Sequence, residues 1–276
     1  MNIKYVYFDC WDTLIKFRLK SSDNIFECFK PHIKNIDSID IHSAETIFHN
    51  FHKKYYSTIR GYELTYKVFC KAQMNLSGIE LDIDLDNDDE LEAFQLELLE
   101  KYYDPIPTDG IICFLDYLKS NGIRMGVISN TIYTKKFTRA AIEKGLAISA
   151  KEFDSYFDFI IVSSEEGLKK PNPDFFRVGM RINGCKNPSE AIYIGDSPYA
   201  DVYGSYQANM NPCHFNWREN YIDELDKLNG LIKFKDYKEM IDLFKQDKDY
   251  IVSTENGIVM EVSGDVYWFK NLLWKT

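Results

Sequence analysis

Tyr5-Val6-Tyr7-Phe8-Asp9-Cys10-Trp11-Asp12-Thr13-Leu14-Ile15 is the stretch of sequence that decides the fold of this chain. Its apolar run predicts a buried strand that ends at one carboxylate, Asp9. A buried charge without a partner costs several kcal/mol, so we infer that another group compensates Asp9 and that Asp9 is functional. Trp11 lies two residues further on, where an alternating strand would place it on the same side as Asp9. Its indole has no proton to exchange near neutral pH, which makes it an unusual neighbour for a functional acid.

Beyond residue 104 the sequence alternates between short apolar runs and amphipathic segments. We predict strands over 124–130, 157–162, 191–194, 213–215 and 231–234, and helices over 111–120, 134–145, 175–182 and 236–246. Continuous apolar strands separated by helices indicate a parallel sheet that is covered on both faces. The predicted fold class is therefore α/β, with a Rossmann-like, doubly wound parallel sheet as its core.

Residues 17–103 have a helical pattern instead. The predicted helices follow Ser22-Asp23, follow Ser43, run from Tyr62 to Leu76 before Gly78, and follow the acidic segment 82–89. With 276 residues, the chain is near the limit of about 250–300 at which single cores stop growing, so we expect two units. We predict a catalytic core over 1–16 and 104–246 and an inserted helical cap over 17–103.

The remaining residues, 247–276, are predicted to form a C-terminal β extension. Two alternating runs flank Asn256-Gly257, which is a hairpin signal. The hairpin either adds to the sheet or covers part of the surface, or it forms a homodimer contact. The sequence does not separate these alternatives.

Charge and cysteine content limit the classes of partner. The formal net charge is −10, from 33 Lys and Arg against 43 Asp and Glu, which argues against a nucleic acid or an anionic membrane as partner. The six cysteines are scattered without a C-x-x-C pair, as expected for buried thiols in a reducing compartment. No apolar stretch approaches the roughly 20 residues that span a bilayer. We expect a soluble cytoplasmic protein.

Polar residues gather where the predicted strands end, and the carboxyl ends of parallel strands meet at one edge of a sheet. Asp9, Asp196 and Asp201 would converge there, and oxygen ligands without His or Cys suit Mg²⁺. Ser129 and the backbone N–H of Asn130 can bind an anion, and the loop 167–173 supplies a lysine. A carboxylate nucleophile, a metal, a lysine and hydroxyl donors are what phosphoryl transfer requires.

These clusters resemble the four motifs of the haloacid dehalogenase superfamily of aspartate-nucleophile hydrolases. The first, D-x-D-x-T-L, corresponds to residues 9–14, and the second, an apolar strand ending in S-N, to 127–130. The third, G-x-x-K-P-x-P, corresponds to 167–173 and makes Lys170 the functional lysine and Lys169 a bystander. The fourth, G-D-S before an aspartate, corresponds to 195–201. The resemblance covers residues 1–245 and includes a helical (C1-type) cap inserted after the first motif.

The resemblance implies roles for these residues. Asp9 would attack phosphorus and form an aspartyl-phosphate, with Lys170 and Ser129 as the other catalytic residues. Ser129, Asn130, Lys170 and Trp11 would contact the substrate. Mg²⁺ would be held by the Asp9 carboxylate, the Trp11 backbone carbonyl, Asp196 and Asp201. In the phosphatases of this superfamily an aspartate at position 11 is the general acid, and here Trp11 replaces it.

Three interpretations of Trp11 follow. The first is a Mg²⁺-dependent phosphatase that is slower or restricted to leaving groups that need little protonation, with solvent or another carboxylate as the proton source. Asp12 is the nearest such acid, but strand alternation would face it away from Asp9 unless the chain turns sharply there. The second is a 2-haloacid dehalogenase-like hydrolase, because halide leaves without a proton, although the G-D-S motif is not typical of that branch. The third is a catalytically weak ligand-binding protein. We favour the first, and a helical lid over the strand ends favours a small phosphorylated metabolite as the substrate.

Overall fold

Six parallel strands form the central sheet, in the order β5-β4-β1-β6-β7-β8. Their bounds are Tyr5–Phe8 (β1), Arg124–Ser129 (β4), Phe157–Val162 (β5), Ala191–Gly195 (β6), Asn211–Phe215 (β7) and Ile232–Phe234 (β8). The chain winds from β1 through β4 to β5, and then returns to add β6, β7 and β8 on the other side of β1. The winding direction thus reverses between β1 and β6, and open α/β sheets bind their ligands at such a point.

This computed structural model describes residues 3–20, 25–58 and 62–249, together with three short strands near the C-terminus. The longer helices beside the sheet are α5 (Ile111–Ser120), α6 (Lys135–Leu146), α7 (Ala150–Tyr156), α9 (Pro173–Ile182) and α11 (Tyr237–Asp249). Shorter turns of helix are η1 (Lys30–His32), α8 (Ser163–Glu166), η2 (Pro188–Glu190), η3 (Pro198–Tyr203), α10 (Gly204–Gln207) and η4 (Asp223–Lys227). No helix in the described ranges is long and apolar enough to cross a membrane.

Helices cover both faces of the sheet, and each face has its own apolar core. Successive strand residues point to opposite faces, so Phe8 and Tyr7 enter different cores. Phe8 lies in the core that includes Phe114 of α5, while Tyr7 lies in the core that includes Phe176 of α9. This arrangement confirms the predicted α/β fold with a doubly wound parallel sheet.

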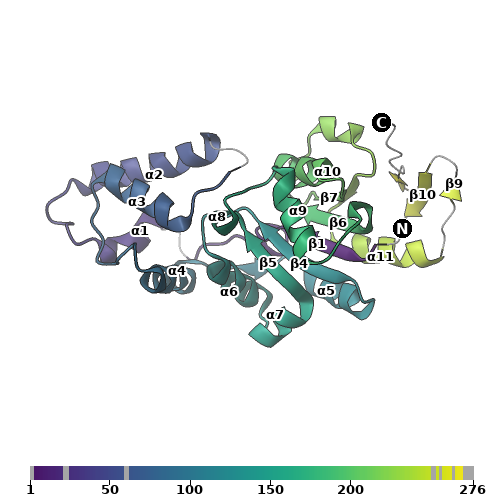
Figure 1. Ribbon diagram of the computed structural model, residues 1–276, viewed down its shortest axis with the longest axis horizontal. Helices are drawn as coiled ribbons and strands as arrows, with labels where there is room; N and C mark the ends of the chain where they lie inside the picture. The colour runs from purple at the N-terminus through teal and green to yellow at the C-terminus, as the bar shows by residue number, and fades with distance from the viewer. Residues whose placement is uncertain are drawn as a thin grey trace.

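Among the described residues, four α-helices interrupt the core after the first strand. They are α1 (Ile25–Phe29), α2 (Ile41–Thr58), α3 (Tyr66–Ser77) and α4 (Asp88–Tyr102). Figure 1 shows α1, α2 and α3 together at one end of the molecule, away from the sheet. The chain leaves and re-enters the core through a short antiparallel pair, β2 (Ile15–Lys16) and β3 (Ile106–Pro107). Residues 17 and 103 as domain boundaries stay a prediction, as does the division as a whole.

Two of these helices begin elsewhere than predicted. α2 begins before Ser43, because the Asp40 side chain accepts hydrogen bonds from the backbone N–H groups of His42 and Ser43. α3 begins at Tyr66 rather than Tyr62, with Thr65 as its N-cap. The predicted cap Ser22-Asp23 of α1 lies outside the described residues.

The C-terminal strands form a sheet of their own. It contains β9 (Ser253–Thr254), β10 (Gly257–Val262) and β11 (Asp265–Phe269), and both pairings are antiparallel. None of these described strands joins the central sheet, so the alternative in which the hairpin extends that sheet is wrong for them. Asn256 of the predicted turn lies outside the described residues, and a role in dimerisation stays a prediction.

Candidate active site

Asp9 lies directly after β1, at the point where the winding of the sheet reverses. Its backbone N–H donates to the carbonyl of Ile194 on β6 (2.9 Å), which fixes the start of the turn that follows the strand. The side chain is buried, and its Oδ1 accepts a hydrogen bond from Lys170 Nζ at 2.6 Å. Burial raises the pKa of Asp9 to about 7, against the opposing effect of Lys170 and with a further increase from Asp201.

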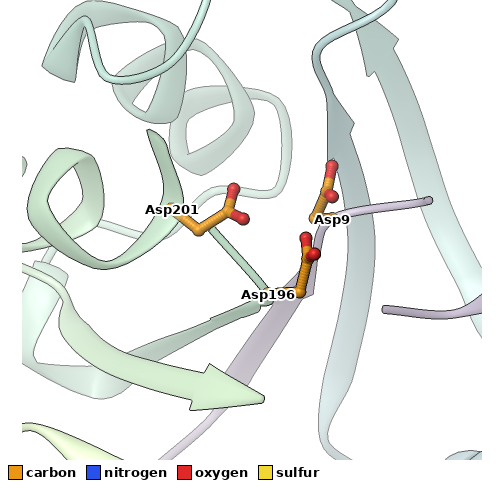
Figure 2. Close-up of side chains that lie close together, drawn as sticks. All are labelled: Asp9, Asp196 and Asp201. Carbon is orange, nitrogen blue, oxygen red and sulfur yellow. The ribbon is translucent and has the colours of Figure 1, made fainter. Parts of the chain in front are cut away.

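Three carboxylates converge here. Asp9, Asp196 and Asp201 each offer one oxygen, and these oxygens all lie within 4.8 Å of one another (Figure 2). Burial, followed by the proximity of the other carboxylates, raises the pKa of Asp196 to about 8. A divalent cation would relieve this repulsion, and a set of carboxylate oxygens fits a hard ion such as Mg²⁺. Gly195 makes the close approach possible, because a Cβ at this position would lie 2.2 Å from Cγ of Asp201.

Lys170 is the buried cation among these acids. Its Nζ lies 2.6 Å from Asp9 Oδ1 and 2.7 Å from Asp201 Oδ1, and it donates a hydrogen bond to the Tyr193 hydroxyl at 2.8 Å. Burial alone would lower the pKa of Lys170, but Asp201 and Asp9 raise it above its ordinary value. The lysine therefore stays protonated and offsets part of the negative charge.

The second motif places a hydroxyl and an amide beside this lysine. Ser129, the last residue of β4, is fully buried, and its Oγ has no hydrogen-bond partner among the described residues. A phosphoryl oxygen would give it one. The side chain of Asn130 is already engaged: it accepts from the Lys170 N–H (2.8 Å) and donates to the Lys170 carbonyl (2.9 Å). The predicted substrate contact of Asn130 is thus left to its backbone N–H.

Trp11 lies in a turn rather than in the strand. β1 ends at Phe8, and Trp11 pairs with Ile15 in an isolated β-bridge, so alternation along a strand does not apply to it. The half-buried indole packs against the rings of Phe17 (centroids 5.5 Å apart) and Tyr103 (6.3 Å), at the connection to the helical insert. The indole of Trp11 has no acidic proton to donate to a leaving group.

Asp12 is held in this turn by an ion pair. The chain turns sharply here, which is the exception to the predicted strand alternation, so alternation does not orient Asp12. Its φ is +58°, a left-handed conformation that is uncommon for residues other than glycine. The carboxylate forms an ion pair with Arg218 and accepts a hydrogen bond from the Phe17 N–H at 3.3 Å. Arg218 and the turn itself therefore hold this carboxylate, and Asp12 is not placed as a substitute acid.

Comparison with known proteins identifies the family. A family model for haloacid dehalogenase-like hydrolases matches residues 3–208. The chain belongs to this family.

Relatives of this haloacid dehalogenase-like hydrolase include a glyceraldehyde 3-phosphate phosphatase of Pyrococcus furiosus, 30% identical over 145 residues, or 52% of this chain and 54% of the relative. A mouse haloacid dehalogenase-like hydrolase domain-containing protein 3 is 24% identical over 223 residues, covering 76% of this chain and 81% of the relative. The chain spans about half the length of the first curated relatives it matches.

Among solved structures, a haloacid dehalogenase-superfamily phosphatase from Thermococcus onnurineus superposes with a TM-score of 0.55 at 18% identity, covering 88% of this chain and 98% of that one. A 2-haloacid dehalogenase from Pseudomonas syringae superposes with a TM-score of 0.57, also at 18% identity, with coverage of 88% and 99%. At this identity the two structures establish the shared fold of this haloacid dehalogenase-like hydrolase and nothing about its substrate.

Sequence reasoning missed a group of residues on β7 and the loop after it, at the edge of the site of this haloacid dehalogenase-like hydrolase. The Asp196 carbonyl is contacted by His214 and Asn220, and the Asp12 carbonyl by Trp217. The carboxylates of both aspartates face Arg218. A signal was present, since these polar residues lie at the end of a predicted strand as the four motifs do.

A second missed contact concerns Lys169, which was interpreted as a bystander. Its Nζ lies 3.6 Å from Oε1 of Glu63, and both side chains are buried. Glu63 also accepts a hydrogen bond from Ser163 Oγ at 3.1 Å, at the end of β5. Lys169 therefore ties the segment before α3 to the loop that carries Lys170, and it is not a solvated surface charge.

Proposed function

We propose that this chain is a Mg²⁺-dependent phosphatase that acts on a small phosphorylated metabolite through an aspartyl-phosphate on Asp9. The observation that carries the proposal is the convergence of the Asp9, Asp196 and Asp201 oxygens within 4.8 Å of one another at the ends of β1 and β6. Lys170 offsets only part of the negative charge of these three carboxylates, so a metal cation among them would relieve the repulsion that is left, and phosphoryl transfer uses such a cation. The relatives named as glyceraldehyde 3-phosphate phosphatases support a phosphate ester as the substrate.

The residues have distinct tasks in this mechanism. Lys170 holds Oδ1 of Asp9, which orients the carboxylate so that its other oxygen can attack phosphorus. The Ser129 hydroxyl, which lacks a described partner, binds a phosphoryl oxygen together with the Asn130 N–H. Asp9, Asp196, Asp201 and the Trp11 carbonyl would hold Mg²⁺, which when bound offsets the negative charge of the phosphoryl group.

The leaving group determines how fast such an enzyme works. Trp11 lies at the position of the general acid and has no acidic proton, and Asp12 is held by Arg218, so neither residue is placed as the general acid. The first step therefore favours esters whose leaving group is stable as an anion, and water must protonate the others. Trp11 also presents a half-buried aromatic face on which such a leaving group can pack.

A dehalogenase-like activity is the second candidate, and the observation that favours it is Trp11 itself. Halide leaves without a proton, so an aromatic residue at this position is no handicap to that reaction. The three converging carboxylates favour the phosphatase, because they could hold a cation that neutralises phosphoryl oxygens. Displacement of halide by Asp9 involves no phosphoryl group and needs no such cation.

One set of assays separates the candidates. We expect p-nitrophenyl phosphate to be hydrolysed in Mg²⁺ and not in EDTA, and Asp9→Asn to abolish the activity because the amide is a poor nucleophile. Unchanged turnover in EDTA would refute the phosphatase, and unchanged turnover by Asp9→Asn would refute the nucleophile. Chloride release from 2-chloropropionate without phosphatase activity would establish the second candidate. No turnover of any substrate, with tight retention of a phosphate ester, would indicate a binding protein.

A further inference from the structure

The segment 214–220 begins in β7 and continues in the loop after it. It forms hydrogen bonds with the backbone of Asp196, a predicted metal ligand. His214 Nε2 and Asn220 Nδ2 each lie 3.1 Å from the carbonyl oxygen of Asp196. A carbonyl only accepts, so both nitrogens donate to it, which assigns the proton of His214 to Nε2. Two donors on one carbonyl restrict the rotation of the peptide that carries the Asp196 side chain.

The same segment also contacts Asp12, in the turn after Asp9. Trp217 Nε1 donates to the carbonyl of Asp12 at 2.8 Å, and Arg218 forms an ion pair with the Asp12 carboxylate. The Arg218 guanidinium lies over the Trp217 ring, with its Cζ 5.0 Å from the ring centroid. Asp12 has a positive φ, and a non-glycine residue keeps such a conformation only where its surroundings hold it. Trp217 and Arg218 provide that restraint.

Arg218 connects the contacts to Asp12 with the contacts to Asp196. Its second guanidinium nitrogen, Nη1, lies 3.8 Å from Oδ2 of Asp196, so one planar group faces the carboxylates of both Asp12 and Asp196. These carboxylates come from turns that follow different strands, β1 and β6. The planar fork of arginine suits such bridging, whereas the ammonium of a lysine is a single point of charge.

We propose that Arg218 is a positioning residue for the cation site: it fixes the Asp12 turn to Asp196 and so holds Asp9 and Asp196 at the separation that a divalent cation requires. The proposal rests on the proposed function, since it takes the three carboxylates to be the cation site. Arg218 has two opposing effects on a cation. Its positive charge repels the ion, which lowers cation affinity. Its ion pairs with Asp12 and Asp196 hold the ligands in place before the ion binds, which raises cation affinity, and we infer that this second effect is larger.

The direction in which substitution of Arg218 changes cation affinity therefore tests the proposal. We expect Arg218→Gln to weaken Mn²⁺ binding by about tenfold or more, as is typical for the loss of a residue that orients metal ligands. Arg218→Lys should fall between the wild type and Arg218→Gln, because it keeps the charge without the fork. Calorimetric titration of the purified full chain with Mn²⁺ measures this without any turnover.

Arg177→Gln is the matched control. Arg177 on α9 is as exposed as Arg218, with side-chain exposures of 45% and 44%, and it too forms an ion pair with an aspartate, Asp174. No described contact joins that pair to Asp9, Asp196 or Asp201, so this variant should bind Mn²⁺ like the wild type. Melting temperatures of all variants, measured in EDTA, identify any loss that is merely a loss of folding.

A double-mutant cycle with Asp12→Asn tests the route of the effect. If Arg218 acts through Asp12, the double variant should bind Mn²⁺ about as weakly as Arg218→Gln alone, because the bridge is already broken. Equal or tighter Mn²⁺ binding by Arg218→Gln, or fully additive losses in the cycle, would overturn the proposal. A wild-type chain that binds no Mn²⁺ would overturn the cation site of the proposed function as well, whereas normal wild-type binding with an unaffected Arg218→Gln would overturn this inference alone.

Discussion

Replacing Trp11 by aspartate puts a carboxyl group two residues after Asp9, where the indole now packs. A general acid contributes about 10²–10⁴-fold to rate, so this substitution should speed the hydrolysis of esters whose leaving groups need a proton. An alkyl phosphate such as glycerol phosphate is of that kind, and p-nitrophenyl phosphate is not. We therefore expect a rise of about 10²-fold or more for the alkyl ester and little change for the aryl ester.

The substitution also has a cost in stability that the structure allows us to bound. Trp11 forms ring pairs with Phe17 and Tyr103, and such pairs contribute about 0.5–1.5 kcal/mol each. Losing both lowers the free energy of unfolding by at least about 1–3 kcal/mol, or roughly 2–12 °C in melting temperature for a chain of this size, because the lost burial of the indole adds to the loss of the ring pairs. Trp11→Asn loses the same ring contacts without adding an acid, so it is the matched control.

The assay is phosphate release from both esters in Mg²⁺, at a temperature below the melting point of either variant. The informative quantity is the ratio of alkyl to aryl turnover in Trp11→Asp relative to the same ratio in Trp11→Asn. A ratio that is equal in the two variants would refute the idea that position 11 faces the leaving group. A lower ratio in Trp11→Asp would refute it more strongly.

Two further predictions concern the buried charges. Lys170→Met leaves Asp9 and Asp201 buried without their cation, so in EDTA at pH 7.5 it should lose about 3–5 kcal/mol of unfolding free energy, partly restored by Mg²⁺; a urea midpoint equal to that of the wild type would contradict this. The pKa values of Asp9 and Asp196 are raised from 3.8 to about 7 and about 8, so the folded chain binds these protons more tightly than the unfolded chain. Their contribution to stability is fully present below pH 4 and is lost as pH rises through 7 and 8. Melting temperatures in EDTA should therefore fall from pH 5 to 8 while the increase caused by Mg²⁺ grows, and a flat or rising profile in EDTA would show that other groups dominate.

Local patterns were sufficient to predict most of the core. Strands buried on both faces consist of continuous apolar runs, so 157–162 was predicted with the bounds of β5, and 111–120 with those of α5. Helix starts in the insert were less predictable. Asp40 and Thr65 cap α2 and α3, and several polar residues nearby carry the same local signal.

The sequence by itself determined the parallel sheet and the meeting of Asp9, Ser129, Lys170 and Asp196 at one edge, because parallel strands bring their carboxyl ends together whatever their order. Only the tertiary structure decided what surrounds them. Arg218 reaches Asp12 because β7 pairs with β6, which itself lies beside β1, and this strand order brings together residues far apart in the chain. The periodicity of a segment reports which of its faces is buried, and it contains no information about which distant loop lies against its end.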